Sequence, residues 1–248
     1  RELRPQKCGW LDNLLLRIGM EFEGRSVVVT GGTGALGTAV VGSLLELGAQ
    51  CRVPYIAAAE VAHFAHRDRV TLVPDCDLTE ESNVSRLYEG ASNLWAAINI
   101  AGGFEMRDLA ETDKAALMRM VNTNLVSCYL SSRFAVLKMP PSGGRIVNVA
   151  ARSALEPRSG AGMSAYVASK AAVAALTQAL AAELAHRNIL VNAVAPSIID
   201  TPANRAAMPK AKHEAWPKPQ EIAATIAFLA SPSNRVTSGA IVPVYGRA

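Results

Sequence analysis

Short runs of β-branched and other apolar residues recur along the chain from Arg25 onward, separated by longer segments with helical periodicity. Parallel strands need crossover connections, so this alternation favours a parallel sheet with helices on both faces. The nearly continuous apolarity of the runs fits strands that are buried on both sides. The runs predict strands over residues 25–30, 49–55, 69–74, 94–100, 144–150, 189–195 and 240–245. The segments between them predict helices over 34–47, 57–66, 80–89, 112–138, 164–186 and 220–230.

No internal repeat or linker divides the chain, and its 248 residues suit a single α/β domain with a large core. We place that domain at 20–248. The Pro- and Lys-containing segment 201–219 interrupts the pattern, and we expect a substrate lid there, with a plain surface loop as the alternative. Residues 1–19 lack the features of a secretory signal. We expect a tag-like or mis-started extension, with a short amphipathic helix as the alternative.

Composition and charge argue against several classes of protein. The net charge is +4, and residues 1–19, with four basic and two acidic side chains, hold half of it. Because no basic run is interleaved with aromatic residues, we expect no nucleic-acid partner. No apolar stretch approaches the roughly 20 residues that span a bilayer, so we expect no membrane association. The four scattered cysteines and ungrouped histidines predict reduced thiols, no metal site and a cytoplasmic location.

A glycine-rich stretch, TGGTGALG (30–37), follows the first predicted strand and opens a helix. Glycines in this context let the backbone approach a pyrophosphate, and the helix N-terminus offers it free N–H groups. An acid at the end of the second strand would favour NAD, and a nearby Arg would favour NADP. The chain has Pro54, Tyr55 and Ile56 there, with Arg52 close in sequence, so both NAD and NADP stay open.

Tyr166 and Lys170 stand four residues apart in SAYVASKAAVAALTQAL (164–180). On a helix such residues share one face, so the phenol and the ammonium can converge. A neighbouring cation lowers the pKa of a phenol, which otherwise lies near 10. We therefore expect Tyr166 to have a lowered pKa and to act as a general acid/base.

With TGGTGALG, NIAG (99–102) and YVASK (166–170) in this order, the chain resembles the short-chain dehydrogenase/reductase superfamily from about Glu23 to its C-terminus. The resemblance implies one doubly wound Rossmann-like α/β domain with a seven-stranded parallel sheet flanked by helices. It also implies NAD(H) or NADP(H), a small carbonyl or alcohol substrate, and a homotetramer.

The resemblance implies a catalytic set of Ser, Tyr and Lys assisted by Asn. Tyr166 and Lys170 match the motif, with Lys170 also binding the nicotinamide ribose, and Asn124 matches the asparagine that holds a relay water. The family's spacing of thirteen residues before the tyrosine gives Ser153, whereas counting from Asn148 gives Ala151. We favour Ser153, and Ala151 stays open because ARSAL…GM…Y also resembles the dihydropteridine reductase branch.

The resemblance also implies a set of cofactor-binding residues. Two positions depart from the family pattern, since Ile100 replaces an Asn of NNAG and Ser197 replaces a Gly of PGxxxT. Besides Tyr166 and Lys170, the set comprises Gly31, Thr33, Ala35, Leu36, Gly37, Tyr55, Asp77, Leu78, Asn99, Ala101, Gly102, Pro196, Ile199 and Thr201.

The alanines after Lys170 occupy every face of the predicted helix, and a helix that is apolar all round must be covered on more than one side. We therefore expect a homo-oligomer, by resemblance a tetramer. The leading hypothesis for function is an NAD(P)-dependent oxidoreductase. A dihydropteridine-type quinonoid reductase and a cofactor-binding regulatory protein without turnover are the alternatives.

Overall fold

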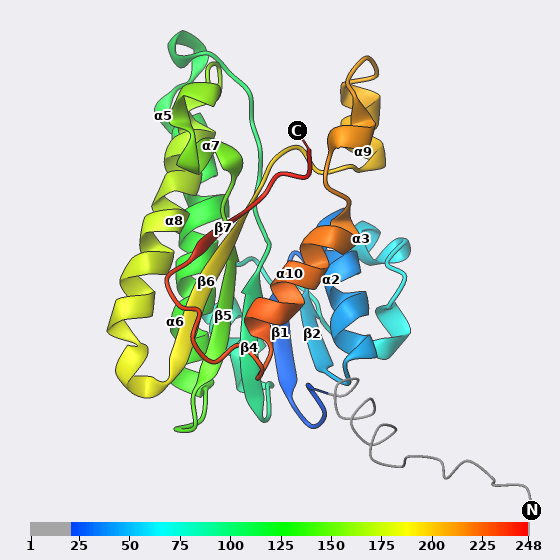
Figure 1. Ribbon diagram of the computed structural model, residues 1–248, viewed down its shortest axis with the longest axis vertical. Coiled ribbons are helices and arrows are strands. Elements are labelled where there is room, and N and C mark those ends of the chain that lie inside the picture. The colour runs from blue at the N-terminus through cyan, green and yellow to red at the C-terminus, as the bar shows by residue number, and fades with distance from the viewer. Residues whose placement is uncertain (1–20, 248) are drawn as a thin grey trace, which may run out of the picture.

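A seven-stranded, fully parallel sheet forms the centre of the protein (Figure 1). The computed structural model describes residues 21–247. The strands lie in the order β3-β2-β1-β4-β5-β6-β7. They are β1 (Ser26–Thr30), β2 (Gln50–Pro54), β3 (Thr71–Val73), β4 (Leu94–Asn99), β5 (Gly144–Val149), β6 (Ile189–Pro196) and β7 (Ile241–Val244).

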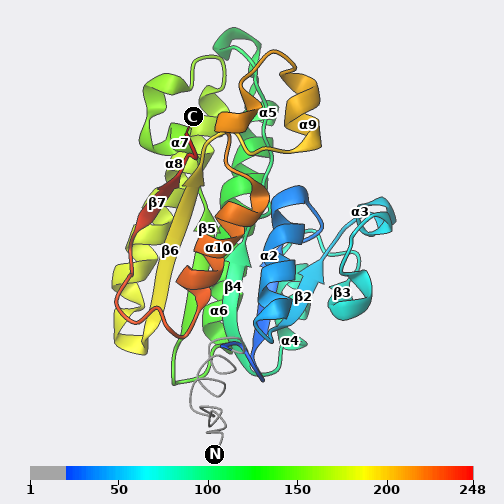
Figure 2. The same cartoon turned by 45° about the vertical axis from the view of Figure 1, so that its right-hand side comes forward.

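Helices connect the strands and cover both faces of the sheet (Figures 1 and 2). A π-helix, Val121–Val126, lies between the α-helices Lys114–Met120 and Ser127–Lys138. The α-helices are α2 (Ala35–Glu46), α3 (Ala58–Ala62), α4 (Glu81–Glu89), α5 (Lys114–Met120), α6 (Ser127–Lys138), α7 (Arg152–Leu155), α8 (Ser164–Glu183), α9 (Pro202–Ala207) and α10 (Pro219–Ala230).

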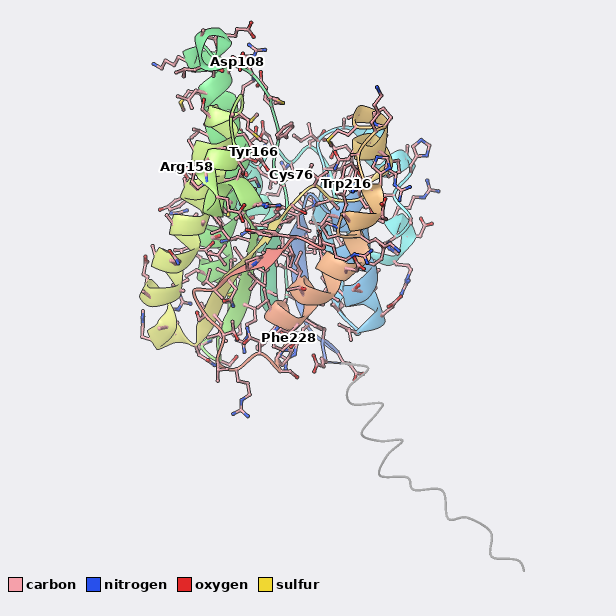
Figure 3. The ribbon with its side chains drawn as sticks, turned by 45° about the horizontal axis from the view of Figure 1, so that its top comes forward. Cys76, Asp108, Arg158, Tyr166, Trp216 and Phe228 are labelled. Carbon is pink, nitrogen blue, oxygen red and sulfur yellow. The ribbon has the colours of Figure 1, made fainter. Side chains whose placement is uncertain are left out.

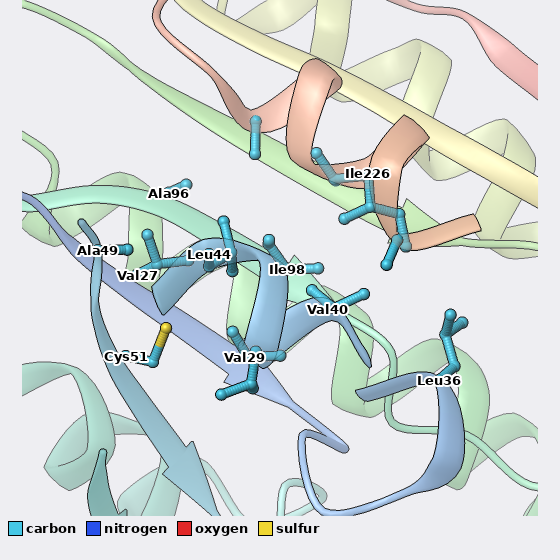
Figure 4. Close-up of a cluster of buried hydrophobic side chains, with 14 of the residues drawn as sticks. Val27, Val29, Leu36, Val40, Leu44, Ala49, Cys51, Ala96, Ile98 and Ile226 are labelled. Carbon is cyan, nitrogen blue, oxygen red and sulfur yellow. The ribbon is translucent and has the colours of Figure 1, made fainter. Parts of the chain in front are cut away.

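One face of the sheet packs against α2 and α10, which also contact each other (Figure 4). Side chains alternate between the faces of a strand, so Val27 and Val29 of β1 point to this layer and Val28 points to the other. Each fully buried Val, Leu or Ile contributes about 1.5–3 kcal/mol relative to an exposed one. The continuous apolar runs of the sequence therefore reflect strands with two covered faces.

The opposite face packs against α4, α6 and α8. Two polar side chains enter this layer, because the same alternation turns Asn99 of β4 and Asn148 of β5 toward α6 and α8. Asn99 Nδ2 donates to Asn148 Oδ1 at 2.8 Å, and Asn148 Nδ2 donates to Thr177 Oγ1 of α8 at 2.9 Å. These hydrogen bonds fix β4, β5 and α8 relative to one another.

All seven predicted strands are present, which confirms the expected single Rossmann-like α/β fold. The predicted helix 112–138 is interrupted by the π-helix, and segment 201–219 contains a short helix, α9. The extension expected at 1–19 lies outside the described residues.

Helix α8 requires one correction to the composition argument. Its 20 residues are apolar enough that, by length and composition alone, the helix could cross a membrane. In this fold it packs along β5 and β6 instead, with Ser169, Lys170 and Thr177 buried. The sequence analysis did not recognise α8 as a long apolar segment, and in this fold that segment is a helix that covers the sheet.

Candidate active site

The carboxyl ends of β1 and β4 lie side by side at the centre of the sheet, where the strand order changes direction. The chain leaves β1 toward α2 on one face, whereas β4 leads on to α6 on the other. Open parallel sheets bind ligands at such a point, outside the carboxyl ends of their strands. The candidate site is therefore built from the loops that follow β1, β4, β5 and β6.

The glycine turn after β1 is shaped for close approach by a ligand. Gly31 has φ +66°, and a Cβ there would lie 2.7 Å from Ala101 N, so neither the conformation nor the space suits a side chain. A Cβ on Gly37 would lie 2.0 Å from Gly31 O. No side chain caps the following helix α2 at Gly34. Its first N–H groups are available to an anion, so this cradle fits the pyrophosphate of a dinucleotide.

The other predicted residues of this turn differ in their exposure. Thr33 is half-buried and Ala35 is exposed at the start of α2. Leu36 is only 6% exposed, and its side chain packs in the core between the sheet and α10. The Leu36 side chain therefore faces the core, and only the Leu36 backbone belongs to the turn.

Past β2 and β3, the predicted residues Tyr55, Asp77 and Leu78 lie in neighbouring loops. Tyr55 pairs through its backbone with Val73 O and Cys76 N, which joins the two loops. Asp77 Oδ1 accepts hydrogen bonds from Thr79 N and Oγ1. Leu78 packs against the apolar core on the face of the sheet that α4, α6 and α8 cover. The Asp77 carboxylate therefore shapes its own turn.

Beyond β4, the loop that starts at Ile100 brings several predicted residues together. Asn99 is buried, and its side chain belongs to the network with Asn148 described above. A Cβ on Gly102 would lie 2.6 Å from Asn124 Oδ1 and 3.1 Å from Lys170 Nζ. Only glycine leaves room here for both side chains, so Gly102, Asn124 and Lys170 converge on one point.

Asn124 sits in the π-helix, and its side chain is held by the protein itself. Oδ1 accepts from Gly103 N at 2.9 Å, while Nδ2 donates to Gly103 O at 3.1 Å and to Ser169 Oγ at 3.0 Å. Both amide hydrogens are used, so only a lone pair of Oδ1 is left for a further partner such as water. Asn124 thus ties the loop after β4 to α8.

Lys170 is 5% exposed in the second turn of α8. Nζ donates to Val149 O of β5 at 2.8 Å. Burial disfavours the charged ammonium and lowers the pKa of Lys170 to about 8.

Tyr166 lies one helical turn before Lys170, near the start of α8 (Figure 3). Its ring makes an edge-to-face contact with Phe104, with 5.0 Å between ring centroids and an interplanar angle of 80°. Burial disfavours the phenolate and raises the pKa of Tyr166 to about 12. The expected lowering of the pKa by Lys170 is therefore wrong in this structure, because desolvation is the dominant influence.

Ser153 and Ala151 both lie in the segment between β5 and α8. Ala151 precedes α7 and Ser153 lies within it, with exposures of 6% and 8%. Within residues 21–247 Ser153 Oγ makes no hydrogen bond, and the one enclosed polar side-chain atom without a partner there is Arg145 Nε. The Ser153 hydroxyl thus reaches the surface and is available to a ligand, whereas Ala151 offers only a methyl group.

The loop after β6 carries the last predicted cofactor residues. Pro196 is buried at the end of the strand, and Ile199 packs against the apolar core on the face of the sheet that α2 and α10 cover. Thr201 Oγ1 accepts from Asn204 N at 3.2 Å and so caps α9. Ser197, which stands at the family's glycine place, donates to Tyr245 O at 2.9 Å. Its hydroxyl ties this loop to the end of β7.

Segment 201–219 is ordered by contacts at its base. Arg205 forms a two-pronged ion pair with Asp200, with nitrogen–oxygen distances of 2.5 and 2.8 Å. An open groove of about 790 Å³ lies between the second half of the segment, the start of α10 and the C-terminal residues. Trp216, labelled in Figure 3, is buried and lines this groove.

Phe104 is a residue of this region that the sequence reasoning missed. It stands two positions after the NIAG motif, and its ring lies against Tyr166 although 62% of its surface is exposed. Met106 and Leu109 follow it with exposures of 67% and 78%. Exposed apolar side chains beside a polar centre indicate a binding surface, and the signal in the sequence was their position directly after the fourth strand.

Comparison with known proteins agrees with this geometry. A family model described as short chain dehydrogenase matches residues 25–212. Cis-4-hydroxycyclohexanecarboxylate dehydrogenase of Sinomonas cyclohexanicum is 36% identical over 247 residues, which cover 92% of this chain and 98% of that protein. Galactitol 2-dehydrogenase of Rhizobium johnstonii is 33% identical, covering 90% and 94%.

Solved structures share the same architecture. The crystal structure of a blue fluorescent protein from a metagenomic library, in complex with NADPH, superposes with a TM-score of 0.79 at 28% identity, covering 90% of this chain and 97% of that one. The matched range contains the glycine turn, Asn124, Tyr166 and Lys170. The chain therefore belongs to the short-chain dehydrogenase/reductase family and is an NAD(P)-dependent oxidoreductase.

Proposed function

We propose that the protein interconverts a carbonyl compound and the corresponding alcohol, with Tyr166 as the general acid/base. The observation that carries this proposal is the convergence of Gly102, Asn124 and Lys170 beside the loop of Phe104, which contacts Tyr166. This group lies at the carboxyl edge of the sheet, next to the glycine turn that fits a dinucleotide. When bound there, the nicotinamide supplies or accepts the hydride.

The raised pKa of Tyr166 suits the direction of carbonyl reduction. A phenol with a pKa of about 12 is protonated at neutral pH, so Tyr166 Oη holds the proton that a carbonyl oxygen needs. Ser153 Oγ donates a hydrogen bond to the same oxygen and stabilises the charge that develops there. The Lys170 ammonium stabilises the phenolate left behind and binds ribose hydroxyls of the cofactor.

Residues at the carboxyl edge of the sheet would bind the cofactor. Gly31 and Gly37 would admit the pyrophosphate to the backbone of the turn between them. The turns of Tyr55 and Asp77 would hold the adenosine, Ala101 and Gly102 the ribose, and Ile199 and Thr201 the carboxamide. Asn124 positions Lys170 and keeps a lone pair for a relay water.

For the substrate, we propose an apolar, preferably alicyclic, secondary alcohol or ketone. Phe104 lies against Tyr166 and is followed by exposed Met106, so an apolar group next to the reacting carbon would be covered. The name of the Sinomonas relative describes a substrate whose hydroxyl-bearing carbon is part of a cyclohexane ring, which also carries a carboxylate on the opposite side. Segment 201–219 would close over this surface as a lid.

We propose that the protein is a cytoplasmic homo-oligomer, a tetramer by family resemblance. The buried residues of α8 form one stripe, Ser169, Lys170, Val173, Thr177 and Ala181. The exposed alanines 168, 175, 179 and 182 lie on the opposite side of the helix. A small-residue face of this kind suits close packing against a second copy of the chain.

A substrate panel tests the proposed function. The purified protein would be assayed with NADH and NADPH against alicyclic ketones, linear ketones and a quinonoid dihydropteridine. Turnover of alicyclic ketones supports the proposal. Turnover of the dihydropteridine alone would favour the quinonoid reductase, and nucleotide binding without turnover of any compound would favour a regulatory role.

A further inference from the structure

The end of β2 lacks the group that would select between the two nicotinamide cofactors. The residues there, Pro54, Tyr55 and Ile56, carry neither an acid nor a base. Arg52, the nearest cation in sequence, is turned away, since its Nε donates to Leu87 O at 3.2 Å and its guanidinium lies against Gly90. Any selection must therefore come from a side chain that is more distant in the sequence.

Glu60 of α3 reaches this place from the following helix. Its Oε1 accepts hydrogen bonds from the backbone N–H groups of Ile56 at 3.0 Å and Ala57 at 2.8 Å. Its Oε2 lies 3.4 Å from Thr33 Oγ1, which belongs to the glycine turn. The carboxylate therefore bridges the end of β2 and the turn after β1, the two segments that enclose the adenosine ribose in a dinucleotide-binding fold.

The charge of this carboxylate is not balanced by an ion pair. Within the described part of the chain, the ion pairs join other residues, and Glu60 takes part in none of them. Oε1 is occupied by two N–H donors, and Oε2 retains a free lone pair beside Thr33. A ribose 2′-hydroxyl could donate to Oε2 in a charge-assisted hydrogen bond. A 2′-phosphate would instead face an unpaired negative charge.

We propose that Glu60 is the residue that selects the cofactor, and that the protein prefers NAD(H) to NADP(H). This inference rests on the proposed binding of a dinucleotide at the glycine turn. Here α3 supplies the acid that is missing from the end of β2. This preference is inferred from the residues of this chain alone. The metagenomic blue fluorescent protein was solved with NADPH, and that cofactor is a property of that protein.

Isothermal titration with fragments of the cofactor tests the proposal without any turnover. 5′-AMP and adenosine 2′,5′-bisphosphate differ only in the 2′-phosphate, so the ratio of their Kd values reports the ribose site alone. The full-length protein should bind 5′-AMP about 10- to 100-fold more tightly, the range that one charged hydrogen bond supplies. NADH and NADPH, titrated in the same way, should show the same order.

Two variants identify the group responsible. Glu60→Gln keeps an oxygen that can accept from Ile56 N and Ala57 N but removes the charge, so the preference should fall toward unity. Glu60→Lys should reverse it in favour of the 2′-phosphate. The matched control is Glu221→Gln, because Glu221 Oε2 accepts from Lys218 N at 2.7 Å at the start of α10 and lines the open groove of Trp216 instead. The control should keep the wild-type ratio.

The outcomes separate this inference from the proposed function. Equal or tighter binding of adenosine 2′,5′-bisphosphate to the wild-type protein would overturn the inference and leave dinucleotide binding intact. An unchanged ratio in both Glu60 variants would also overturn it. Failure of NADH and NADPH alike to bind would instead contradict the proposed site at the glycine turn.

Discussion

Among single residues, Tyr166 decides whether the proposed chemistry is correct. Tyr166→Phe removes the proton donor and keeps the ring that contacts Phe104, so kcat should fall by about 10²- to 10⁴-fold. The Kd for NADH, measured by titration, should stay within about twofold of the wild-type value. Tyr129→Phe is the control, because Tyr129 is 49% exposed on α6. A Tyr166→Phe variant with the wild-type rate would exclude Tyr166 as the acid.

The pKa of Lys170 predicts how cofactor affinity depends on pH. Burial lowers this pKa to about 8, so the ammonium loses its proton as pH rises through that value. The hydrogen bonds that we propose it makes to ribose hydroxyls would then lose their charge, and the Kd for NADH should increase about tenfold between pH 7 and pH 9.5. Titrations across that range measure the effect.

Lys170→Arg provides the control for this pH dependence. A guanidinium stays protonated throughout the range, so any NADH binding that the variant retains should not change with pH. A wild-type Kd that is constant from pH 6 to pH 9.5 would contradict the prediction.

The sequence predicts residues whose partners are close in the chain. The glycine turn and the spacing of Tyr166 and Lys170 are local patterns, and the structure places both at the carboxyl edge of the sheet. The raised pKa of Tyr166 depends on burial by distant segments. Glu60 is held locally by the N–H groups of Ile56 and Ala57, but its approach to Thr33, 27 residues away, depends on how the turns after β1 and β2 pack together. Neither long-range feature leaves a local signal in the sequence. The sequence therefore predicted a lowered pKa for Tyr166, where the structure shows a raised one, and did not identify Glu60 as an acid near the end of β2.

At the level of elements, strands were easier to predict than the details of helices. A strand that is buried on both faces leaves a continuous apolar run, and all seven runs became strands. The π-helix Val121–Val126 leaves no such mark, because it shifts the backbone hydrogen bonds by one residue without changing the apolar pattern. Helix α9 was missed because it is six residues long, too short to show periodicity.

The π-helix gives a prediction about Asn124. Asn124→Ala removes the side-chain partner of Gly103 N and Gly103 O, and Ser169 Oγ keeps only its bond to Tyr166 O. An unsatisfied buried polar group costs about 1–3 kcal/mol. The free energy of unfolding, measured by chemical denaturation, should fall by at least about 1 kcal/mol, and kcat should fall with it. The control, Asn122→Ala, changes an exposed residue of the same π-helix. Equal stabilities of the two variants would contradict the bracing role.

At the scale of the whole molecule, the two layers on the sheet differ in how completely they are covered. The layer of α2 and α10 encloses a large core cluster with the sheet. In the other layer, exposed alanines predominate on the side of α8 away from the sheet, with Gln178 beside them, although polar residues are usual on a solvent-facing helix. A second copy of the chain packed on α8 would account for this composition, because small side chains allow two helices to approach closely.

Ala175→Arg tests this proposed assembly. Ala175 is exposed on this side of α8, and an arginine there would hold two closely packed helices apart and bury a charge between them. The wild-type protein should sediment as a tetramer at micromolar concentration and the variant as a smaller species, with its circular dichroism unchanged. Ala206→Arg on α9 introduces the same exposed charge outside this face and should leave the assembly intact. A monomeric wild-type protein, or a variant with unaltered mass, would show that the alanine face of α8 is not the interface.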